Sequence, residues 1–329
     1  MSALLRTTLE RLMMREDLAE EEAAALLDAL TEPALDPHLA SALLVALRSK
    51  GETAAELRGF ARAMRARARR PQIPPGAPIV DVVGTGGDAS GSLNISTGVA
   101  LLSAACGLRV VKHGNRSVSS KSGSADTLEA LGLTLPLDEE RAGACLAAAG
   151  FTFLFAPHYH PATKAIARVR AALGVRTVFN MLGPLTNPAA PPFSLVGAFS
   201  LPAAELMANA FLGLPIERVM VIHGEPGWDE ATPIGPFHVF DVRAGTVTHS
   251  VRDASAYGIA KCKAEDLAGG DANYNAGRLR AVLEGREQGA HRDAIVLGAA
   301  LVLELTGGEP EPGAAARAAA RAIDDGRGA

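Results

Sequence analysis

The sequence predicts an α/β protein in which a small all-helical part precedes a larger part built around a central sheet. Over residues 1–70, apolar side chains recur only at helical spacing. A proline-rich linker, PQIPPGAP at 71–78, ends that pattern. Beyond the linker, short apolar runs alternate with helical patterns, which is typical of a sheet covered by helices.

The composition is that of an ordinary globular protein and disfavours several classes of function. Of the 329 residues, 48% are hydrophobic and 21% are charged, which argues against disorder. The net charge of −4 leaves no overall basic field for nucleic acid or anionic lipid. Ten Phe, three Tyr and one Trp are too few for the stacking platforms that bind single strands. We therefore expect no nucleic-acid partner.

Neither a membrane span nor an oxidising compartment is expected. The stretch closest to a span, 195–216, is interrupted by Pro202, Glu205 and Asn209. Charges also come too early in the N-terminal segment for a signal peptide. The three cysteines lie far apart, without zinc-ligand or CxxC spacing, so we interpret them as small core side chains. The expectation is a reduced, cytoplasmic, soluble protein.

Residues 1–70 divide into four short amphipathic helices. Apolar residues at 5, 9, 12 and 13 predict the first helix, and the pattern repeats over 18–30. A third helix over 37–49 begins behind the capping residue Asp36. A fourth runs from the cap at Thr53 to about residue 70. The apolar faces of such short helices require a partner.

Strands and helices alternate in the remainder of the chain. The expected strands are 79–83, 108–112, 151–155, 195–199 and 218–223. The expected helices are 96–106, 124–131, 138–149, 161–173, 202–212, 274–284 and 292–305. Two further runs, 237–242 and 246–250, meet at Ala244-Gly245 and predict an antiparallel hairpin.

A glycine-rich segment, GTGGD at 84–88, follows the first expected strand. Glycines let backbone amides approach phosphate oxygens closely, and the helix that opens near Ser96 favours an anion at its N-terminus. The segment resembles a degenerate dinucleotide fingerprint. However, the helix begins about eight residues late, and Lys112 stands where an acid would bind ribose. A plain tight turn is an equally good interpretation of this loop alone.

A second polar segment, 112–124, follows the next strand and precedes another helix. Its thirteen residues include two lysines, one arginine, five serines and two glycines, which suits a phosphate or pyrophosphate cradle. It is not a Walker A loop, because no glycine precedes Lys121 at the required place. Two such loops after successive strands lie at one edge of the sheet, where ligands of α/β sheets bind.

The third feature is the acidic pair Asp229-Glu230, which comes soon after the strand expected at 218–223. Adjacent carboxylates are most often a solvated surface pair. If the pair faces the two phosphate-type loops, its oxygens suit magnesium, which binds through one or two carboxylates and substrate phosphates. Both interpretations stay open on the sequence alone.

Taken in order along the chain, these segments resemble the anthranilate phosphoribosyltransferases. The most specific matches are KHGNRSVSSKSGSAD at 112–126 and RTVFNMLGPLTNP at 176–188. The other matches are KGET at 50–53, GTGGD at 84–88, NIST at 94–97, FLFAP at 153–157, HGE at 223–225, DE at 229–230 and EDLAGGD at 265–271. The resemblance covers nearly the whole chain.

The resemblance implies a homodimer of two-domain subunits. Because the amphipathic helices of 1–50 have too little chain of their own to bury both faces, we expect them to form the dimer contact. The helical domain would comprise 1–70 and about 161–188, and the α/β domain 75–160 and about 189–329. The sheet would be mixed and mainly parallel, as in nucleoside phosphorylases and phosphoribosyltransferases of this architecture.

The implied reaction moves the phosphoribosyl group of phosphoribosyl pyrophosphate to the amine of anthranilate, in tryptophan biosynthesis. It would use two Mg²⁺ ions per active site. Because the amine of anthranilate is neutral at pH 7, no residue is assigned as a general acid or base. Electrostatic stabilisation of the departing pyrophosphate is the larger task.

By position, the resemblance assigns most site residues to the two phosphate-type loops. Phosphoribosyl pyrophosphate would bind Gly84, Gly87, Asp88, Ser92, Asn94, Ile95, Ser96, Thr97, Lys112, His113, Gly114, Asn115, Arg116, Ser117, Val118, Ser119, Ser120 and Ser124. Anthranilate would contact Gly84, Asn115 and Arg170, with Arg170 as the partner of its carboxylate. The metal ligands would be Ser96, Asp229 and Glu230.

Two alternatives remain at this point. A pyrimidine nucleoside phosphorylase shares the architecture and would act on phosphate and a nucleoside, but should lack the KHGN and GPLTNP segments. A non-enzymatic relative that binds nucleic acid would need a basic surface groove, which the net charge of −4 disfavours. Departures from the family pattern at Ser92, Arg168, Trp228 and Gly298 bear on substrate preference and not on the reaction class.

Overall fold

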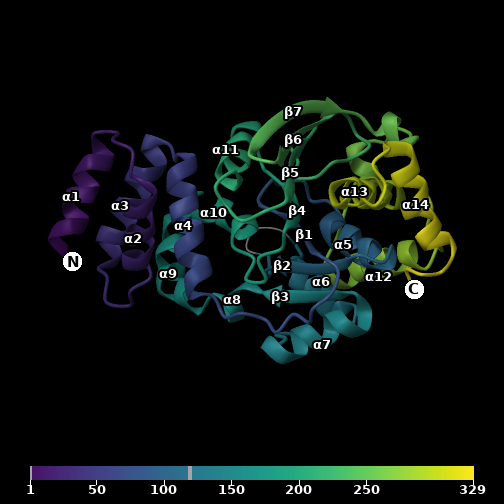
Figure 1. Ribbon diagram of the computed structural model, residues 1–329, viewed down its shortest axis with the longest axis horizontal. Coiled ribbons are helices and arrows are strands. Elements are labelled where there is room, and N and C mark those ends of the chain that lie inside the picture. The colour runs from purple at the N-terminus through teal and green to yellow at the C-terminus, as the bar shows by residue number, and fades with distance from the viewer. Residues whose placement is uncertain (1, 118–120) are drawn as a thin grey trace.

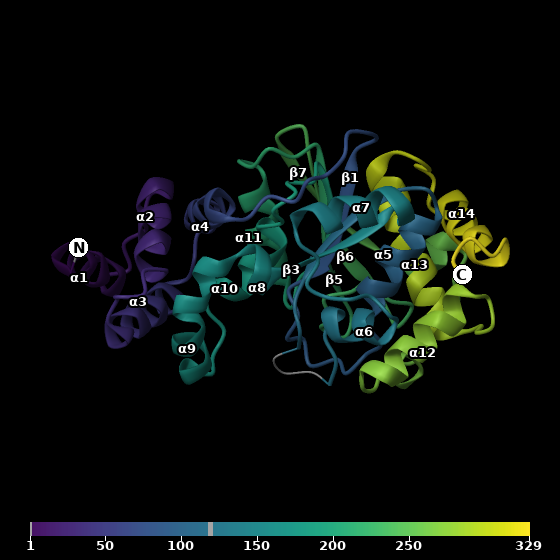
Figure 2. The ribbon, with the colours of Figure 1, turned by 90° about the horizontal axis from the view of Figure 1, so that it is seen from below.

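The computed structural model describes residues 2–117 and 121–329 and shows an elongated molecule in three successive regions (Figure 1). The N-terminal helices lie at one end, the sheet lies in the middle, and the C-terminal helices lie at the other end. Figure 2 shows the same order in a perpendicular view, with the two termini far apart. The expected division into a helical part and an α/β part is thus visible in the fold.

The first four helices form where the apolar spacing predicts them. They are α1 (Ser2–Met13), α2 (Glu20–Leu30), α3 (Pro37–Lys50) and α4 (Ala54–Arg67). Asp36 caps α3 by accepting a hydrogen bond from His38 N at 2.7 Å. Thr53 and Glu56 form a capping box at the start of α4. The Glu56 carboxylate is fully buried and also accepts from Leu18 N and Lys50 Nζ, which joins α4 to α3 and to the segment that precedes α2.

A later segment returns to the helical region. It contains α8 (Ala156–Tyr159), the 3₁₀ turn η1 (Pro161–Thr163), α9 (Lys164–Leu173), α10 (Phe179–Leu182) and the 3₁₀ turn η2 (Gly183–Leu185). The single helix expected over 161–173 therefore begins with a 3₁₀ turn. Ile166 and Val169 of α9 lie in one hydrophobic core with Leu43 of α3 and Phe60 of α4. This core continues onto the sheet through α11 (Leu201–Phe211).

The sheet has seven strands in the order β3-β2-β1-β4-β5-β6-β7. Its strands are β1 (Ile79–Gly84), β2 (Arg109–Gly114), β3 (Phe151–Phe155), β4 (Phe193–Gly197), β5 (Arg218–Gly224), β6 (Phe237–Arg243) and β7 (Thr246–Arg252). The first five are parallel, and β5, β6 and β7 pair antiparallel, as the predicted hairpin requires. The chain order reverses between β1 and β4, so the ligand crevice is expected at the carboxyl ends of these two strands.

Alternating side chains send the strands' apolar residues to two different cores. Val80 and Val82 of β1 face the core made with α5 (Ile95–Ala105), α12 (Ala272–Leu283), α13 (Ala290–Thr306) and α14 (Pro312–Asp324). Val83 belongs to the opposite core, shared with α11 and the N-terminal helices. Helices α6 (Ser124–Ala130) and α7 (Glu139–Ala149) complete the α/β part. None of the helices in the described part of the chain combines the length and the apolar character needed to cross a bilayer.

Several elements differ from the expectations. The short helices α8 and α10 were not expected, and β4 begins at Phe193, two residues before the expected start. Strand β4 ends at Gly197, two residues before the expected end, because the chain leaves the sheet to reach Ser200, whose side chain caps α11. Helix α14 has no counterpart among the expected helices, although the residues of its buried face, almost all of them alanines, recur at helical spacing. The departure at Gly298 also has a structural reason: a Cβ there would overlap the Val99 side chain, so glycine lets α13 approach α5 closely.

Candidate active site

The three polar segments meet at the carboxyl edge of the sheet, over the point where the strand order reverses. Gly84 and Gly197, the last residues of β1 and β4, lie opposite each other in the sheet. After β5, the chain turns sharply, because Gly224 N donates to Trp228 O and Trp228 N donates back to Gly224 O, both at 2.9 Å. This turn brings Asp229 and the residue after it back over the strand ends.

The acidic pair contacts the first phosphate-type loop directly. Asp229 Oδ2 accepts a hydrogen bond from Gly86 N at 2.6 Å, and Glu230 Oε1 accepts one from Ser96 N at 3.1 Å. Asp229 N in turn donates to Asp88 Oδ2 at 3.3 Å. Of the two interpretations open on the sequence, the solvated surface pair is wrong for Asp229, whose side chain is buried.

Glycines at three strand ends make room for this pair. A Cβ on Gly84 would overlap the Asp229 carboxylate, and a Cβ on Gly197 would overlap the Asp229 carbonyl oxygen. A Cβ on Gly224 would overlap the carbonyl oxygen of Glu230. The glycines that the sequence places at the ends of β1, β4 and β5 are therefore required by close approach of the acidic loop.

The three carboxylates at this edge repel one another in a buried setting. Burial and the charge of Asp88 raise the pKa of Asp229 to about 7. Burial and the charge of Asp229 raise the pKa of Glu230 well above its ordinary value, and Lys112 opposes that rise. A divalent cation would relieve this repulsion, and an all-oxygen donor set suits magnesium. Among residues 2–117 and 121–329, no group of three or more His, Cys, Asp or Glu side chains forms a complete metal site.

Lys112 supplies a buried positive charge beneath the two loops. Only 2% of the residue is exposed, and its Nζ donates to Val82 O at 2.5 Å and to Ser96 Oγ at 3.2 Å. Burial lowers its pKa, whereas the charges of Asp81, Glu230 and Asp229 act in the opposite direction. The second phosphate-type loop is thereby tied to the same Ser96 that contacts Glu230.

The described residues Arg116, Ser117 and Gly123 of the second loop contact acidic side chains of α6. Arg116 forms ion pairs with Asp126 at 2.7 Å and with Glu129 at 2.6 Å. Asp126 Oδ2 also accepts from Ser117 N and Gly123 N, which closes the loop at its base. The three predicted contacts Val118, Ser119 and Ser120 lie outside the described residues.

Two arginines of the returning segment differ in what they touch. Arg170 of α9 is half-buried, with its guanidinium carbon 5.0 Å from the ring centroid of Phe179, and burial lowers its pKa. No acidic side chain in the described part of the chain forms an ion pair with it by the usual distance. Arg176, which the motif analysis did not single out, donates to Gly87 O at 2.5 Å and lies over the Phe199 ring.

Asp81 is a buried charged residue whose contacts near the candidate site the sequence did not predict. Its carboxylate is fully buried on β1, where Oδ1 accepts from His113 N at 3.2 Å and Oδ2 accepts from Asn187 Nδ2 at 2.8 Å. Burial raises its pKa to about 6. A single carboxylate inside the otherwise apolar strand IVDVV was the available signal. The contact fixes the GPLTNP segment against β1 and β2.

The ring of His113 lies between β2 and the same segment. Its Nδ1 is 3.1 Å from Gly183 O, so Nδ1 carries the proton, because a carbonyl oxygen only accepts. Burial and the neighbouring His160 lower its pKa to about 3, which keeps the imidazole neutral at physiological pH. His113 therefore joins the two parts of the molecule without adding charge.

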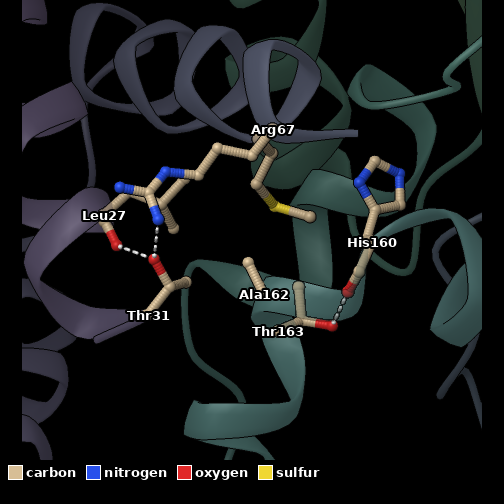
Figure 3. A pocket seen from close by; sticks show the side chains of 7 residues that line it. Leu27, Thr31, Arg67, His160, Ala162 and Thr163 are labelled. Atoms are coloured by element: carbon tan, nitrogen blue, oxygen red, sulfur yellow. Dashed lines mark hydrogen bonds between the residues drawn. The ribbon is translucent and has the colours of Figure 1, made fainter. Parts of the chain in front are cut away.

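A small cavity lies elsewhere, within the helical region (Figure 3). It is lined by Leu27, Thr31, Met64, Arg67, His160, Ala162 and Thr163. Its volume of about 10 Å³ admits at most one water molecule. None of the residues predicted to bind substrate or metal lines it, so it is separate from the candidate active site.

Both parts of the chain match models of one protein family. Residues 6–68 match the helical bundle domain of a glycosyl transferase family, and residues 76–329 match its a/b domain. The anthranilate phosphoribosyltransferase of Rubrobacter xylanophilus is 44% identical over 323 residues, which cover 98% of this chain and 94% of that relative. The corresponding protein of Herpetosiphon aurantiacus is 43% identical, over 95% of this chain and 92% of its own.

Solved structures agree with these relatives over the whole fold. The anthranilate phosphoribosyltransferase of Thermus thermophilus superposes with a TM-score of 0.91 and 41% identity, covering 98% of this chain and 95% of its own. The Saccharomyces cerevisiae enzyme, in complex with PRPP and Mg, superposes with a TM-score of 0.90 and 25% identity. The match covers 100% of this chain and 95% of the yeast chain. Sequence identity, full-length coverage and shared architecture together show that the chain belongs to the anthranilate phosphoribosyltransferases, within the glycosyl transferase family.

Proposed function

We propose that this protein transfers the phosphoribosyl group of phosphoribosyl pyrophosphate to the amine of anthranilate and releases pyrophosphate, as a step of tryptophan biosynthesis. The observation that carries the proposal is the acidic pair at the β1–β4 crevice, with Asp229 buried and both carboxylates bonded to backbone amides of the first phosphate-type loop. Yeast relatives in complex with PRPP and Mg, or with 4-fluoroanthranilate, support it. The named relatives favour it over a nucleoside phosphorylase or a nucleic-acid-binding protein.

The donor would bind across both loops. Its contacts would come from Gly84, Gly87, Asp88, Ser92, Asn94, Ile95, Ser96, Thr97 and the segment from Lys112 to Ser120, together with Ser124. Backbone amides of the glycine loop and the N-terminus of α5 suit phosphate oxygens. The buried ammonium of Lys112 offsets negative charge from beneath.

Two magnesium ions would be held by Asp229, Glu230 and Ser96. The protein oxygens present fit this ion, and substrate phosphates would supply further ligands. Bound there, magnesium would offset the charge that develops on the departing pyrophosphate. The hydrogen bonds from Gly86 N and Ser96 N hold the two carboxylates in fixed orientations for this task.

The acceptor would lie between Gly84, Asn115 and Arg170. The Arg170 guanidinium has a forked set of donors that matches a carboxylate in two-point fashion. The amine needs no strong base, because it is neutral before reaction. The charge-neutral His113 is consistent with this, since its lowered pKa excludes an imidazolium near the loops at pH 7.

We further propose that the protein is a homodimer in the cytoplasm. The helical domain would comprise 1–70 and about 161–188, and its α1 and α3 would form the contact. Four large apolar side chains are exposed on those two helices and the residue after α1: Leu4, Met13, Met14 and Val45. The three free thiols suit a reducing compartment.

One assay tests the reaction. The purified protein is mixed with anthranilate, phosphoribosyl pyrophosphate and Mg²⁺, and the loss of anthranilate fluorescence is followed. We expect consumption that requires all three components and stoichiometric release of pyrophosphate. Phosphorolysis of a pyrimidine nucleoside, without consumption of anthranilate, would contradict the proposal and favour the phosphorylase.

A further inference from the structure

The side-chain amide of Asn94, at the start of α5, is occupied within the protein. Its Oδ1 accepts from Thr127 Oγ1 at 2.6 Å and from Asn275 Nδ2 at 2.7 Å, and its Nδ2 donates to Ser122 O at 3.2 Å. An amide oxygen has two lone pairs, so these two donors satisfy Oδ1 fully. Asn94 therefore joins the first phosphate-type loop to the end of the second one.

Asn275 reaches this point from α12, 181 positions away in sequence. Its side chain is buried, and its Oδ1 accepts from Gly270 N at 2.8 Å. Thr127 is also buried, with its Oγ1 2.8 Å from Ser122 Oγ. Because Thr127 gives its only hydroxyl proton to Asn94, its Oγ1 can only accept in the contact with Ser122 Oγ, which also lies 3.4 Å from Gly123 O. Each amide orientation in the cluster is thus fixed by its neighbours.

The backbone preceding Asn275 lies against the first loop as well. Gly269 N donates to Gly91 O at 2.8 Å, and Leu93 N donates to Leu267 O at 3.0 Å. A Cβ on Gly269 would overlap the backbone of Ser92, so glycine is required there. These contacts give the EDLAGGD segment, which carries no assigned role in the reaction, a structural connection to the donor site.

The position of Asn94 controls the beginning of α5. Its side chain makes no capping hydrogen bond to α5, because the amide is engaged with the neighbouring segments. The next turn carries Ser96, whose N–H contacts Glu230 and whose hydroxyl accepts from Lys112. Whatever displaces Asn94 therefore displaces Ser96 relative to the buried lysine and the acidic pair.

We propose that Asn275 is a positioning residue for the donor site: through Asn94, it holds residues 84–97 in register with Ser122, in the described end of the second phosphate-type loop. Asn275 makes no contact with substrate in this proposal. The inference rests on the proposed function, because it assumes that these two loops bind phosphoribosyl pyrophosphate.

The N275D variant tests the proposal. It keeps an oxygen for Gly270 N–H but replaces the donor with an oxygen that faces Asn94 Oδ1. We expect KM for phosphoribosyl pyrophosphate to rise roughly tenfold or more, as for a lost buried hydrogen bond. KM for anthranilate should change by less than about twofold. Equilibrium titration with phosphoribosyl pyrophosphate and Mg²⁺ should show the same loss without turnover.

The matched control is N273D, which makes the same change at an exposed position of the same helix. It should match the wild type in both KM values and in titration. T127V removes the other hydrogen bond to Asn94 Oδ1. It should also raise KM for phosphoribosyl pyrophosphate without raising KM for anthranilate. In the N275D/T127V double variant, the fold-increase in KM for phosphoribosyl pyrophosphate should be smaller than the product of the two single increases. Both substitutions remove a hydrogen bond to the same oxygen atom, Asn94 Oδ1.

Three results would overturn the proposal: an unchanged KM for phosphoribosyl pyrophosphate in N275D, equal rises in KM for both substrates, or independent effects of N275D and T127V. If N275D does not fold, T127V alone decides by the same comparison of the two KM values. A wild-type protein that does not consume anthranilate would contradict the proposed function instead, and the two failures are therefore distinguishable.

Discussion

Gly86 donates its backbone N–H to Asp229 Oδ2 at 2.6 Å, across 143 positions of sequence. This amide of the glycine loop, which is proposed to bind the donor, is thus already bonded to a carboxylate. The same holds for Ser96 N and Glu230. An anionic donor that takes these amides competes with the acidic pair, and a cation bound to the carboxylates reduces that competition. Where phosphoribosyl pyrophosphate and Mg²⁺ bind as proposed, this geometry would couple the binding of one to the binding of the other.

The first prediction concerns the space at the end of β1. In G84A, the added methyl group would overlap the Asp229 carboxylate, which must move away from Gly86. Displacement of a positioning group by about 1 Å can reduce turnover about a hundredfold. We expect kcat/KM to fall by at least that factor while the circular dichroism spectrum stays unchanged.

The control is G277A, on α12, where a Cβ meets no atom within 4 Å. Replacing an exposed helical glycine by alanine should stabilise the fold by about 0.5–1 kcal/mol and leave kcat/KM unchanged. Wild-type turnover in G84A would show that the approach of Asp229 to Gly84 does not matter for the reaction.

The second prediction is a pH dependence of stability without magnesium. The native state raises the pKa of Asp229 from 3.8 to about 7, so between these values it binds a proton that the unfolded chain has lost. Stability should therefore fall as pH rises from about 4 to about 7. D229N removes this charge and should melt above the wild type at pH 8, by about 2–4 °C for each kcal/mol gained.

Scanning calorimetry in the presence of a chelator measures this difference. The difference in melting temperature between D229N and the wild type should shrink as the pH is lowered toward 4. Added Mg²⁺ should raise the melting temperature of the wild type more than that of D229N. A D229N variant that melts below the wild type at pH 8 would contradict the prediction.

The third prediction concerns the contribution of the acidic pair to turnover. Both residues lie in the loop after β5, so the D229A/E230A double variant should fold normally. Without the two carboxylates, the charges of magnesium and pyrophosphate are no longer held in register, and kcat should fall by several orders of magnitude. Near-normal activity at ordinary Mg²⁺ concentration would remove the pair from the mechanism.

The periodicity of the sequence predicted most of the fold, because most helices and strands bury large apolar side chains that recur at helical or strand spacing. In β1, the alternation of Val80 and Val82 with Val83 corresponds to the two cores of the structure. Large apolar side chains are missing from α14, whose buried face is mostly alanine, and this helix was not predicted. The end of β4 was placed two residues late, because the chain leaves the sheet there to reach the Ser200 cap of α11. Those boundaries depend on tertiary contacts.

Motifs located the three segments of the site but not the residues that hold them together. Asn275 and Asp81 act through partners 181 and 106 positions away, and such contacts follow from strand register and crossovers. Arg176 was visible in the RTVFN motif, yet its contact with Gly87 depends on how the returning segment approaches the glycine loop. Local pattern cannot supply that geometry.

The fourth prediction concerns assembly through α1 and α3. Leu4 is 68% exposed and Val45 is 43% exposed, and both would be covered in the proposed dimer. Light scattering at micromolar concentration should show a dimer for the wild type and a monomer for L4E/V45E, with unchanged helical content. V251E, at an exposed position of β7, is the control and should remain dimeric. A wild-type monomer with full activity would contradict the proposed contact.

The last prediction separates the acceptor site from the donor site. Arg170 is half-buried over Phe179 and has no ion-pair partner among the described residues, whereas Arg168 on the same helix is exposed. Loss of a charge-assisted hydrogen bond worth about 1.5–3 kcal/mol weakens binding of a ligand roughly 10- to 150-fold. R170A should therefore raise KM for anthranilate by such a factor, and R170K should not restore it, because lysine lacks the forked donors. KM for phosphoribosyl pyrophosphate should change little in either variant, and R168A should match the wild type. Equal rises in KM for both substrates, or an unchanged KM for both, would show that Arg170 does not bind the carboxylate of anthranilate.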